Sequence, residues 1–153
     1  MNNSFWKRTA AVALFGAVVA AAGASAAPRV IQIKGGDDMK YSVKTINATA
    51  GEELTIVLSV KSAMAKDAMA HNFVLIDPST DVNTFVTKAA VARKTEFIPA
   101  ALADKILAHS PLAGDGETVE VTFKAPAKPG TYPYLCTFPG HYAGGMQGQL
   151  IVK

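Results

Sequence analysis

The run from Cys136 to Met146 constrains the fold more than any other part of the chain. It holds the only cysteine of the 153-residue sequence, and a histidine and a methionine follow at equal intervals, as His141 and Met146. A thiolate, an imidazole and a thioether are the soft and borderline ligands that copper prefers. If the strands before and after this run are adjacent and antiparallel, the residues between them form a loop on which the three side chains converge. The spacing therefore predicts a metal site on a loop between two adjacent strands.

The first 26 residues have the pattern of a secretory signal peptide. Lys7 and Arg8 give a positive start, residues 10–22 are apolar, and Ala24-Ser25-Ala26 fits the rule for signal cleavage. We expect export, to the periplasm of a Gram-negative bacterium. The apolar run is shorter than the roughly 20 residues that span a bilayer, so a retained signal anchor is the weaker alternative. No cysteine stands at the cleavage site, which argues against a lipid anchor.

Cleavage would leave residues 27–153 as one domain of 127 residues, enough for its own core. Without Lys7 and Arg8, 13 basic residues face 12 acidic ones, and the formal charge falls from +3 to +1. The basic balance of the full chain therefore belongs largely to the signal peptide. It argues for neither nucleic acid nor an anionic membrane as a partner, and we expect no stable membrane insertion.

A single cysteine in an exported domain cannot form an internal disulfide, although the compartment would permit one. Three explanations compete for Cys136: an inert buried side chain, an intermolecular bridge, or a metal ligand. For a lone cysteine the buried side chain is the commonest case. The neighbouring histidine and methionine favour the metal ligand.

The pattern of the chain after residue 26 is that of short strands separated by turns. Alternating or β-branched segments predict strands at residues 30–34, 40–47, 54–60, 72–76, 118–123, 132–136 and 149–153. Gly51 and the Gly114-Asp115-Gly116 segment mark turns. Strands at these intervals are typical of an all-β sandwich or closed barrel in Greek-key order. Residues 82–108 interrupt the pattern, and the helical composition of 89–94 and 100–107 predicts a partly helical flap.

His71 is the leading candidate for a fourth ligand. It begins a predicted strand and could approach the end of the sandwich where the loop with Cys136, His141 and Met146 lies. Two imidazoles and a thiolate in a plane, with a distant thioether on the axis, form the trigonal site of blue copper. Taken alone, His71 would be a surface or capped side chain and Met146 a core residue. The presence of the whole set favours ligation by both.

Three motifs resemble those of azurins and auracyanins. They are Cys-Thr-Phe-Pro-Gly-His at 136–141, Ala-His-Asn-Phe-Val at 70–74 and Ile-Leu-Ala-His-Ser at 106–110. The resemblance extends over nearly all of residues 27–153. It implies a cupredoxin sandwich, one type 1 copper ion, and electron transfer by Cu(II)/Cu(I) cycling with transient redox partners. It also implies no enzymatic activity, and we expect a monomer.

Carried over by position, the resemblance implies that His71, Cys136 and His141 bind copper and that Met146 binds weakly on the axis. The backbone carbonyl of Ala70 becomes a candidate on the opposite axis, where azurins carry glycine. Four residues separate His141 from Met146, as in auracyanins, whereas azurins typically have three. The chain also lacks the azurin disulfide and has Phe73 where azurins often carry tryptophan.

The same match suggests how the site is held and reached. The backbone N–H groups of Asn72 and Phe138 would point at the Cys136 sulfur, and the Asn72 side chain would tie its strand to Thr137. An exposed edge of His141 would admit electrons. Its apolar rim would dock partners briefly and would consist of Met69, Pro139, Tyr142 and Ala143. His109, the third histidine, belongs to a motif that azurins have away from copper, so we expect no ligation there.

Two other classes of function remain as alternatives. Cys136 and a histidine are the nucleophile and base of cysteine hydrolases, but no third orienting residue accompanies them. A copper carrier or storage protein would use several methionines or cysteines around an open site. The mixed and enclosed set found here favours a redox role.

Overall fold

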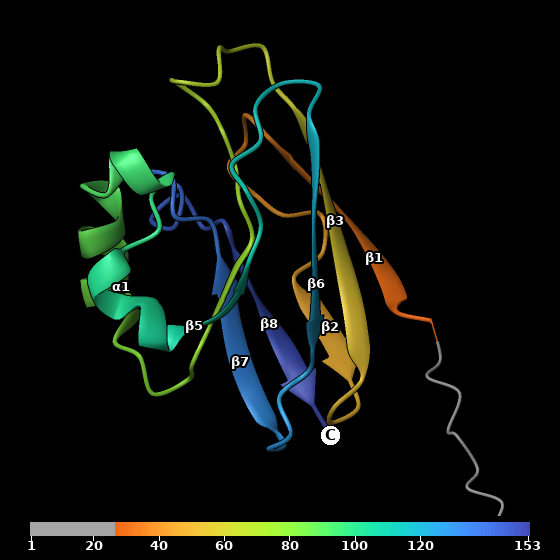
Figure 1. Ribbon diagram of the computed structural model, residues 1–153. Coiled ribbons are helices and arrows are strands. Elements are labelled where there is room, and N and C mark those ends of the chain that lie inside the picture. Colours follow the sequence, from red (N-terminus) through yellow and green to blue (C-terminus); the bar gives the residue numbers. More distant parts are fainter. Residues whose placement is uncertain (1–26) are drawn as a thin grey trace, which may run out of the picture.

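The computed structural model describes residues 27–153, so the predicted signal peptide lies outside the described residues. The chain forms two sheets that pack face to face (Figure 1). The first sheet has the order β1-β3-β6, with β1 at Arg29–Gly36, β3 at Glu53–Lys61 and β6 at Thr118–Lys124. The second has the order β2-β8-β7-β4-β5, with β2 at Thr45–Ala48, β8 at Gln147–Val152, β7 at Gly130–Leu135, β4 at Val74–Ile76 and β5 at Ile106–His109. The predicted β-sandwich is confirmed.

Within each sheet, strands from distant parts of the chain pair with one another. β1 runs parallel to β3, and β2 runs parallel to β8, while the other pairs are antiparallel. Gly51 and Gly116 lie in predicted turns with φ of +75° and +72°, a region that glycine enters at no steric cost. The expected strand at 40–47 is wrong over its first half, because β2 begins only at Thr45.

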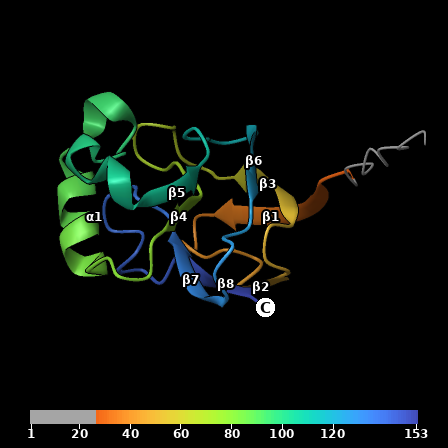
Figure 2. The ribbon, with the colours of Figure 1, turned by 60° about the horizontal axis from the view of Figure 1, so that its bottom comes forward.

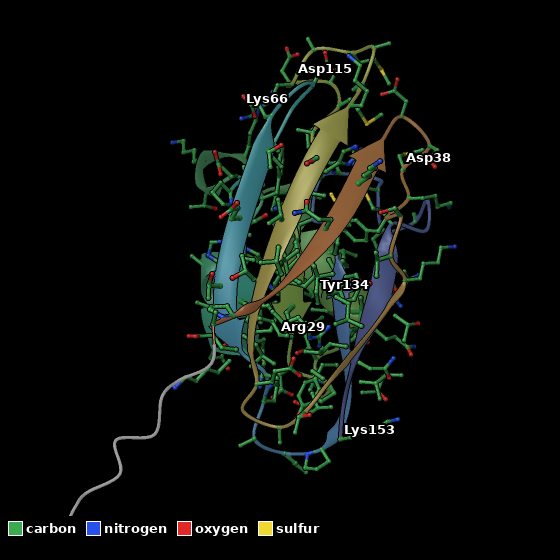
Figure 3. The ribbon with its side chains drawn as sticks, turned by 90° about the vertical axis from the view of Figure 1, so that its right-hand side faces the viewer. Arg29, Asp38, Lys66, Asp115, Tyr134 and Lys153 are labelled. Carbon is green, nitrogen blue, oxygen red and sulfur yellow. The ribbon has the colours of Figure 1, made fainter. Side chains whose placement is uncertain are left out.

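The main core fills the space between the sheets. Alternate residues of β3 and its neighbours, such as Leu54, Ile56 and Leu58, point inward and are fully buried. Tyr134 of β7 lies between the layers (Figure 3), and its hydroxyl donates to the Val43 carbonyl at 2.7 Å. Gly148, directly opposite on β8, makes room for this ring, since a Cβ there would lie 2.3 Å from its Cζ.

The flap predicted at 82–108 is partly helical and packs outside the second sheet (Figures 1 and 2). Helix α1 spans Val82–Ala90, and its N-cap residue Asp81 accepts a bond of 2.7 Å from the Thr84 N–H. Short 3-10 helices follow at Arg93–Thr95 (η1) and Ala100–Lys105 (η2). Phe85 of α1 is buried in a second apolar cluster with Val74 and Leu135.

The prediction of helix through residue 107 is wrong, because residues 106–109 form β5 and pair with β4. The amino-acid composition of this segment favours a helix. In the folded chain, however, its backbone pairs with the free edge of β4, and this pairing decides the structure. Within residues 27–153, no helix has both the length and the hydropathy needed to cross a membrane.

Candidate metal centre

His71, Cys136 and His141 meet at one end of the sandwich. All three are buried, and their potential ligand atoms lie within 4.8 Å of one another. The Nδ1 atoms of the two histidines are 3.1 Å apart. The Cys136 sulfur lies 3.5 Å from Nδ1 of His141 and 3.9 Å from Nδ1 of His71. The fold thus brings together residues that stand 65 positions apart in the sequence.

Met146 completes this group from the far end of the loop. Its side chain is fully buried. A Cβ added to Gly35 would lie 2.9 Å from Cε of Met146 and 3.2 Å from Cδ2 of His71. The thioether and the imidazole therefore border the same small space, and Gly35 leaves that space free. No sequence pattern singled out this glycine.

His71 is placed by the strands around it. Its backbone forms a bridge with Ala113, with N–H to O distances of 2.8 Å in both directions. Three residues later, β4 pairs with β7 through Val74 and Leu135. Because these strands are antiparallel neighbours, the residue that leads into β4 and the residue that follows β7 emerge at the same end of the sheet.

The loop between β7 and β8 is closed by its own backbone. The Cys136 N–H donates to the Met146 carbonyl at 3.1 Å, and the Met146 N–H donates to the His141 carbonyl at 2.9 Å. Gly140 and Gly145 adopt φ of +85° and +92°, which lets the chain curl this tightly. The Lys40 ammonium donates to the Gly144 carbonyl and ties the loop to the β1–β2 connection.

Asn72 joins the two halves of the site. Its side-chain oxygen accepts from the Thr137 N–H at 3.0 Å, and its amide nitrogen donates to the Thr137 hydroxyl at 2.8 Å. The Tyr41 hydroxyl donates to the Asn72 backbone carbonyl from within the core. The predicted tie between Asn72 and Thr137 is confirmed, and Tyr41 adds a contact that the sequence did not reveal.

Burial controls the protonation of the site. It raises the pKa of the Cys136 thiol to about 12, although the backbone N–H groups of Asn72 and Phe138 act in the opposite direction by favouring the thiolate. Burial, followed by the nearby His71, lowers the pKa of His141 to about 4. Burial also lowers the pKa of His71. At neutral pH the metal-free site is therefore an uncharged pair of imidazoles beside a thiol.

This arrangement fits a soft metal ion. Two neutral imidazoles that turn the same nitrogen toward each other and toward a sulfur concentrate lone pairs in one buried space. A cation bound there would accept these lone pairs. It would also stabilise the thiolate and so offset the free energy needed to deprotonate the thiol. Nitrogen, thiolate and thioether donors together select copper over hard cations such as magnesium or calcium. His71, Cys136, His141 and Met146 thus form a type 1 copper-like site.

The surroundings of the site differ from expectation in one respect. His141 is only 2% exposed, so the prediction of an exposed imidazole edge is wrong. The Phe138 ring packs against the His141 ring, with a centroid-to-centroid distance of 4.7 Å. Met69 is also buried and contributes little to an outer rim, whereas Pro139 and Ala143 are exposed.

Two other positions bear on the predicted site. The Ala70 carbonyl lies 4.0 Å from the Cys136 sulfur, so it faces the site. His109 is exposed on β5 and lies outside the buried group.

Comparison with known proteins agrees with this geometry. A family model described as copper binding proteins, plastocyanin/azurin family, matches residues 28–153. Auracyanin-A of Chloroflexus aurantiacus is 37% identical over 120 residues, which cover 77% of this chain and 70% of that protein. Azurin of Pseudomonas aeruginosa is 32% identical over 126 residues, covering 80% and 84%.

Solved structures give the same result. The structure titled as auracyanin A, a "blue" copper protein of Chloroflexus aurantiacus, superposes with a TM-score of 0.72 at 36% identity. The match covers 82% of this chain and 99% of that one. The predicted resemblance and the prediction of copper as cofactor are both confirmed.

Proposed function

The chain belongs to the plastocyanin/azurin family of copper-binding proteins, and on this premise we propose that it carries single electrons between redox partners. His71 and His141 would hold one copper ion through Nδ1, Cys136 through its sulfur, and Met146 through its thioether. The bound ion supplies a Cu(II)/Cu(I) couple that changes by one electron. The observation that carries the proposal is the mixed donor set in a fully buried, hydrogen-bonded site.

The residues around the site would support electron transfer by restricting the movement of the copper donors. The thiolate favours Cu(II), while the thioether and the apolar shell favour Cu(I), so one arrangement accommodates both states. The Asn72–Thr137 hydrogen bonds and the backbone bonds across the Cys136–Met146 loop hold the donors in place. A site that rearranges little exchanges electrons rapidly.

Addition of Cu(II) to metal-free protein tests the centre. We expect an intense thiolate-to-copper absorption band and a narrow copper hyperfine splitting, both lost in Cys136→Ser. His109→Ala is the matched control and should leave both signals intact. His141→Gly should keep a coloured site that takes up external imidazole. A colourless complex would contradict the proposal.

A copper carrier is the alternative function, and redox cycling separates it from an electron carrier. Ascorbate should bleach the band and ferricyanide should restore it over repeated cycles. The copper should stay bound in the presence of a Cu(I)-specific chelator. Rapid loss of Cu(I) to the chelator would favour the carrier, because a protein that delivers copper must release it.

We propose in addition that the protein is exported and acts as a monomer. The support for export is the signal-like pattern of residues 1–26. Expression of the full chain in a Gram-negative host, followed by N-terminal sequencing of the periplasmic fraction, should find Ala27 as the first residue. An uncleaved chain in the membrane fraction would support the signal anchor instead.

A further inference from the structure

The turn that follows η1 holds two residues in a backbone conformation that non-glycine residues seldom adopt. Glu96 has φ of +51° and Phe97 has φ of +62°, both in the left-handed region. Among the residues that the structure describes, Met39 is the only other non-glycine residue with a positive φ. Such a conformation persists only where the surrounding structure holds it, and it is concentrated at functional sites. Two contacts hold this turn, one from each side chain.

The Glu96 carboxylate holds the segment of backbone that aligns His71. Its Oε2 atom accepts from the Leu112 N–H at 3.0 Å. The next residue, Ala113, forms both backbone hydrogen bonds of the bridge to His71, each of 2.8 Å. One side chain of the flap is therefore bonded directly beside the residue against which the first histidine is placed.

The Phe97 side chain leaves the flap and enters the main core. It is buried and belongs to the same apolar cluster as Phe138 and Met146. The next residue, Ile98, packs instead with the second cluster, which contains Phe85 of α1. Within residues 82–105, Phe97 is the only member of the main cluster. The turn thus sends two adjacent apolar side chains into different cores.

Phe97 is the outer member of a row of aromatic rings that ends in the metal centre. Its centroid lies 5.1 Å from that of Phe138, and the two rings meet edge to face at 66°. Phe138 in turn lies 4.7 Å from the His141 ring, which is 4.8 Å from the His71 ring. The Phe138 ring is therefore in contact with Phe97 as well as with the second histidine.

We propose that Glu96 and Phe97 are positioning residues for the two histidines of the metal centre. Glu96 acts on His71 through the Leu112–Ala113 backbone, and Phe97 acts on His141 through the Phe138 ring. In a close-packed interior, contacts of this kind limit how far a donor can move. The purpose of this restriction rests on the proposed function, but the positioning itself is measurable in the metal-free protein. Figure 1 shows the flap beside the loop that joins β7 to β8.

Amide hydrogen exchange in the metal-free protein tests the Glu96 contact. Glu96→Ala removes the acceptor but keeps a Cβ in the left-handed conformation, whereas Glu96→Gln keeps an oxygen that can accept the bond. The reporters are the amides of His71, Leu112 and Ala113, each measured relative to Ile56 in β3, which follows global unfolding. We expect the three reporters to exchange about 10-fold faster in Glu96→Ala and less than about 3-fold faster in Glu96→Gln.

The matched control for this experiment is Asp81→Ala. It removes another carboxylate of the flap that accepts from a backbone N–H, that of Thr84 in α1. The three reporter amides should stay within about 2-fold of their original rates. Equal acceleration in Asp81→Ala would show that general loosening of the flap is responsible, and unchanged rates in Glu96→Ala would show that the Glu96 contact has no effect. Either result overturns the proposal.

The NMR signals of the His141 ring in the metal-free protein test the Phe97 contact. Phe97→Leu and Phe97→Met keep an apolar side chain in the core but remove the ring. We expect the His141 ring protons to shift in both variants, because the Phe138 ring beside them loses its outer contact. Phe85→Leu, in the second cluster, is the control and should leave these signals in place. Unchanged signals in the Phe97 variants, or equal shifts in the control, would contradict the proposal.

Copper-loaded samples connect the positioning to the proposed function. The copper hyperfine splitting and the reduction potential should change in Glu96→Ala and Phe97→Leu, and Glu96→Gln should restore both. Variants with a lower Tm but native copper signals would show a role in stability alone and overturn the proposal. Absence of the thiolate-to-copper band in the unmodified protein would instead refute the proposed function. The exchange rates and the His141 signals would still decide whether the two residues position the histidines.

Discussion

The buried metal centre and the open hollow between α1 and the β7–β8 loop share the Cys136–Ala143 segment but differ in exposure and in what holds them. The centre is enclosed, uncharged at neutral pH without metal, and held by hydrogen bonds that are themselves buried. The hollow is open, and most of the α1 side chains that line it, such as Asn83, Thr87 and Ala90, are exposed. Substitutions in the centre should therefore change stability and the copper signals. Those in the exposed lining of the hollow should leave both intact.

The largest effect is expected beneath the centre, at Gly148. A methyl group there would lie 2.3 Å from Cζ and the hydroxyl oxygen of Tyr134, two residues before Cys136. Gly148→Ala must displace the ring and break its bond to the Val43 carbonyl, so we expect a loss of about 3 kcal/mol in the free energy of unfolding. Urea denaturation measures this loss. The solvent-facing turn glycine Gly116 has φ of +72°, and Gly116→Asn should cost under about 1 kcal/mol. Equal effects would contradict the packing argument.

The second-largest loss of stability is expected on substitution of Asn72. Asn72→Ala leaves the buried Thr137 N–H without its partner and separates the two halves of the site, at a cost of about 2 kcal/mol. The copper hyperfine splitting should also change, because the donors are held less firmly. Exposed Asn83 on α1 is the control, and Asn83→Ala should alter stability by less than about 0.5 kcal/mol. A native spectrum and native stability in Asn72→Ala would show that this tie is dispensable.

Acid should weaken the metal-free centre. The pKa of His141 is lowered by burial to about 4, whereas the unfolded chain protonates near 6.5. Between these values the unfolded state binds more protons, so the free energy of unfolding falls as pH drops, by on the order of 2 kcal/mol. Thermal denaturation across this range measures the slope, and His141→Gln should flatten it. Stability that rises toward pH 4 would contradict the assignment.

Lys40 should contribute less to the free energy of unfolding than Asn72 does. Its ammonium donates to the Gly144 carbonyl, and Lys40→Met removes this tie while keeping most of the apolar stem. We expect about 1 kcal/mol of destabilisation and a shift in the thiolate-to-copper band, because the Met146 end of the loop gains freedom. Lys44→Met, at an exposed position on the same connection, serves as the control. Identical behaviour of the two variants would remove the role of Lys40.

The exposed wall of the hollow, which includes Val91, should show the smallest effect on stability. Val91→Ser replaces an 85% exposed side chain, so unfolding should change by less than about 0.5 kcal/mol and the copper spectrum should be native. A large loss of stability would mean that the Val91 side chain is structural, and the contrast with the centre would fail.

The sequence was sufficient where local pattern and motif carry the information. Alternation predicted β3 and β6, and the ligand types and their spacing predicted which four residues share one end of the sandwich. The sequence was insufficient where the structure of a segment depends on contacts with residues far away in the chain. Residues 106–109 become a strand because β4 offers an edge, and His141 is buried by tertiary packing that includes the Phe138 ring. The roles of Gly35, Lys40 and Tyr41 depend on contacts that no spacing encodes.

The central claim is that four preorganised residues hold a copper ion that changes by one electron with little rearrangement. Crystal structures of the copper-loaded protein in both oxidation states, with anomalous data at the copper edge, test it most directly. The account predicts one copper ion between His71, Cys136, His141 and Met146 in both states, with donor positions that differ by no more than a few tenths of an ångström. Copper bound elsewhere, or a donor that leaves the ion on reduction, would contradict it.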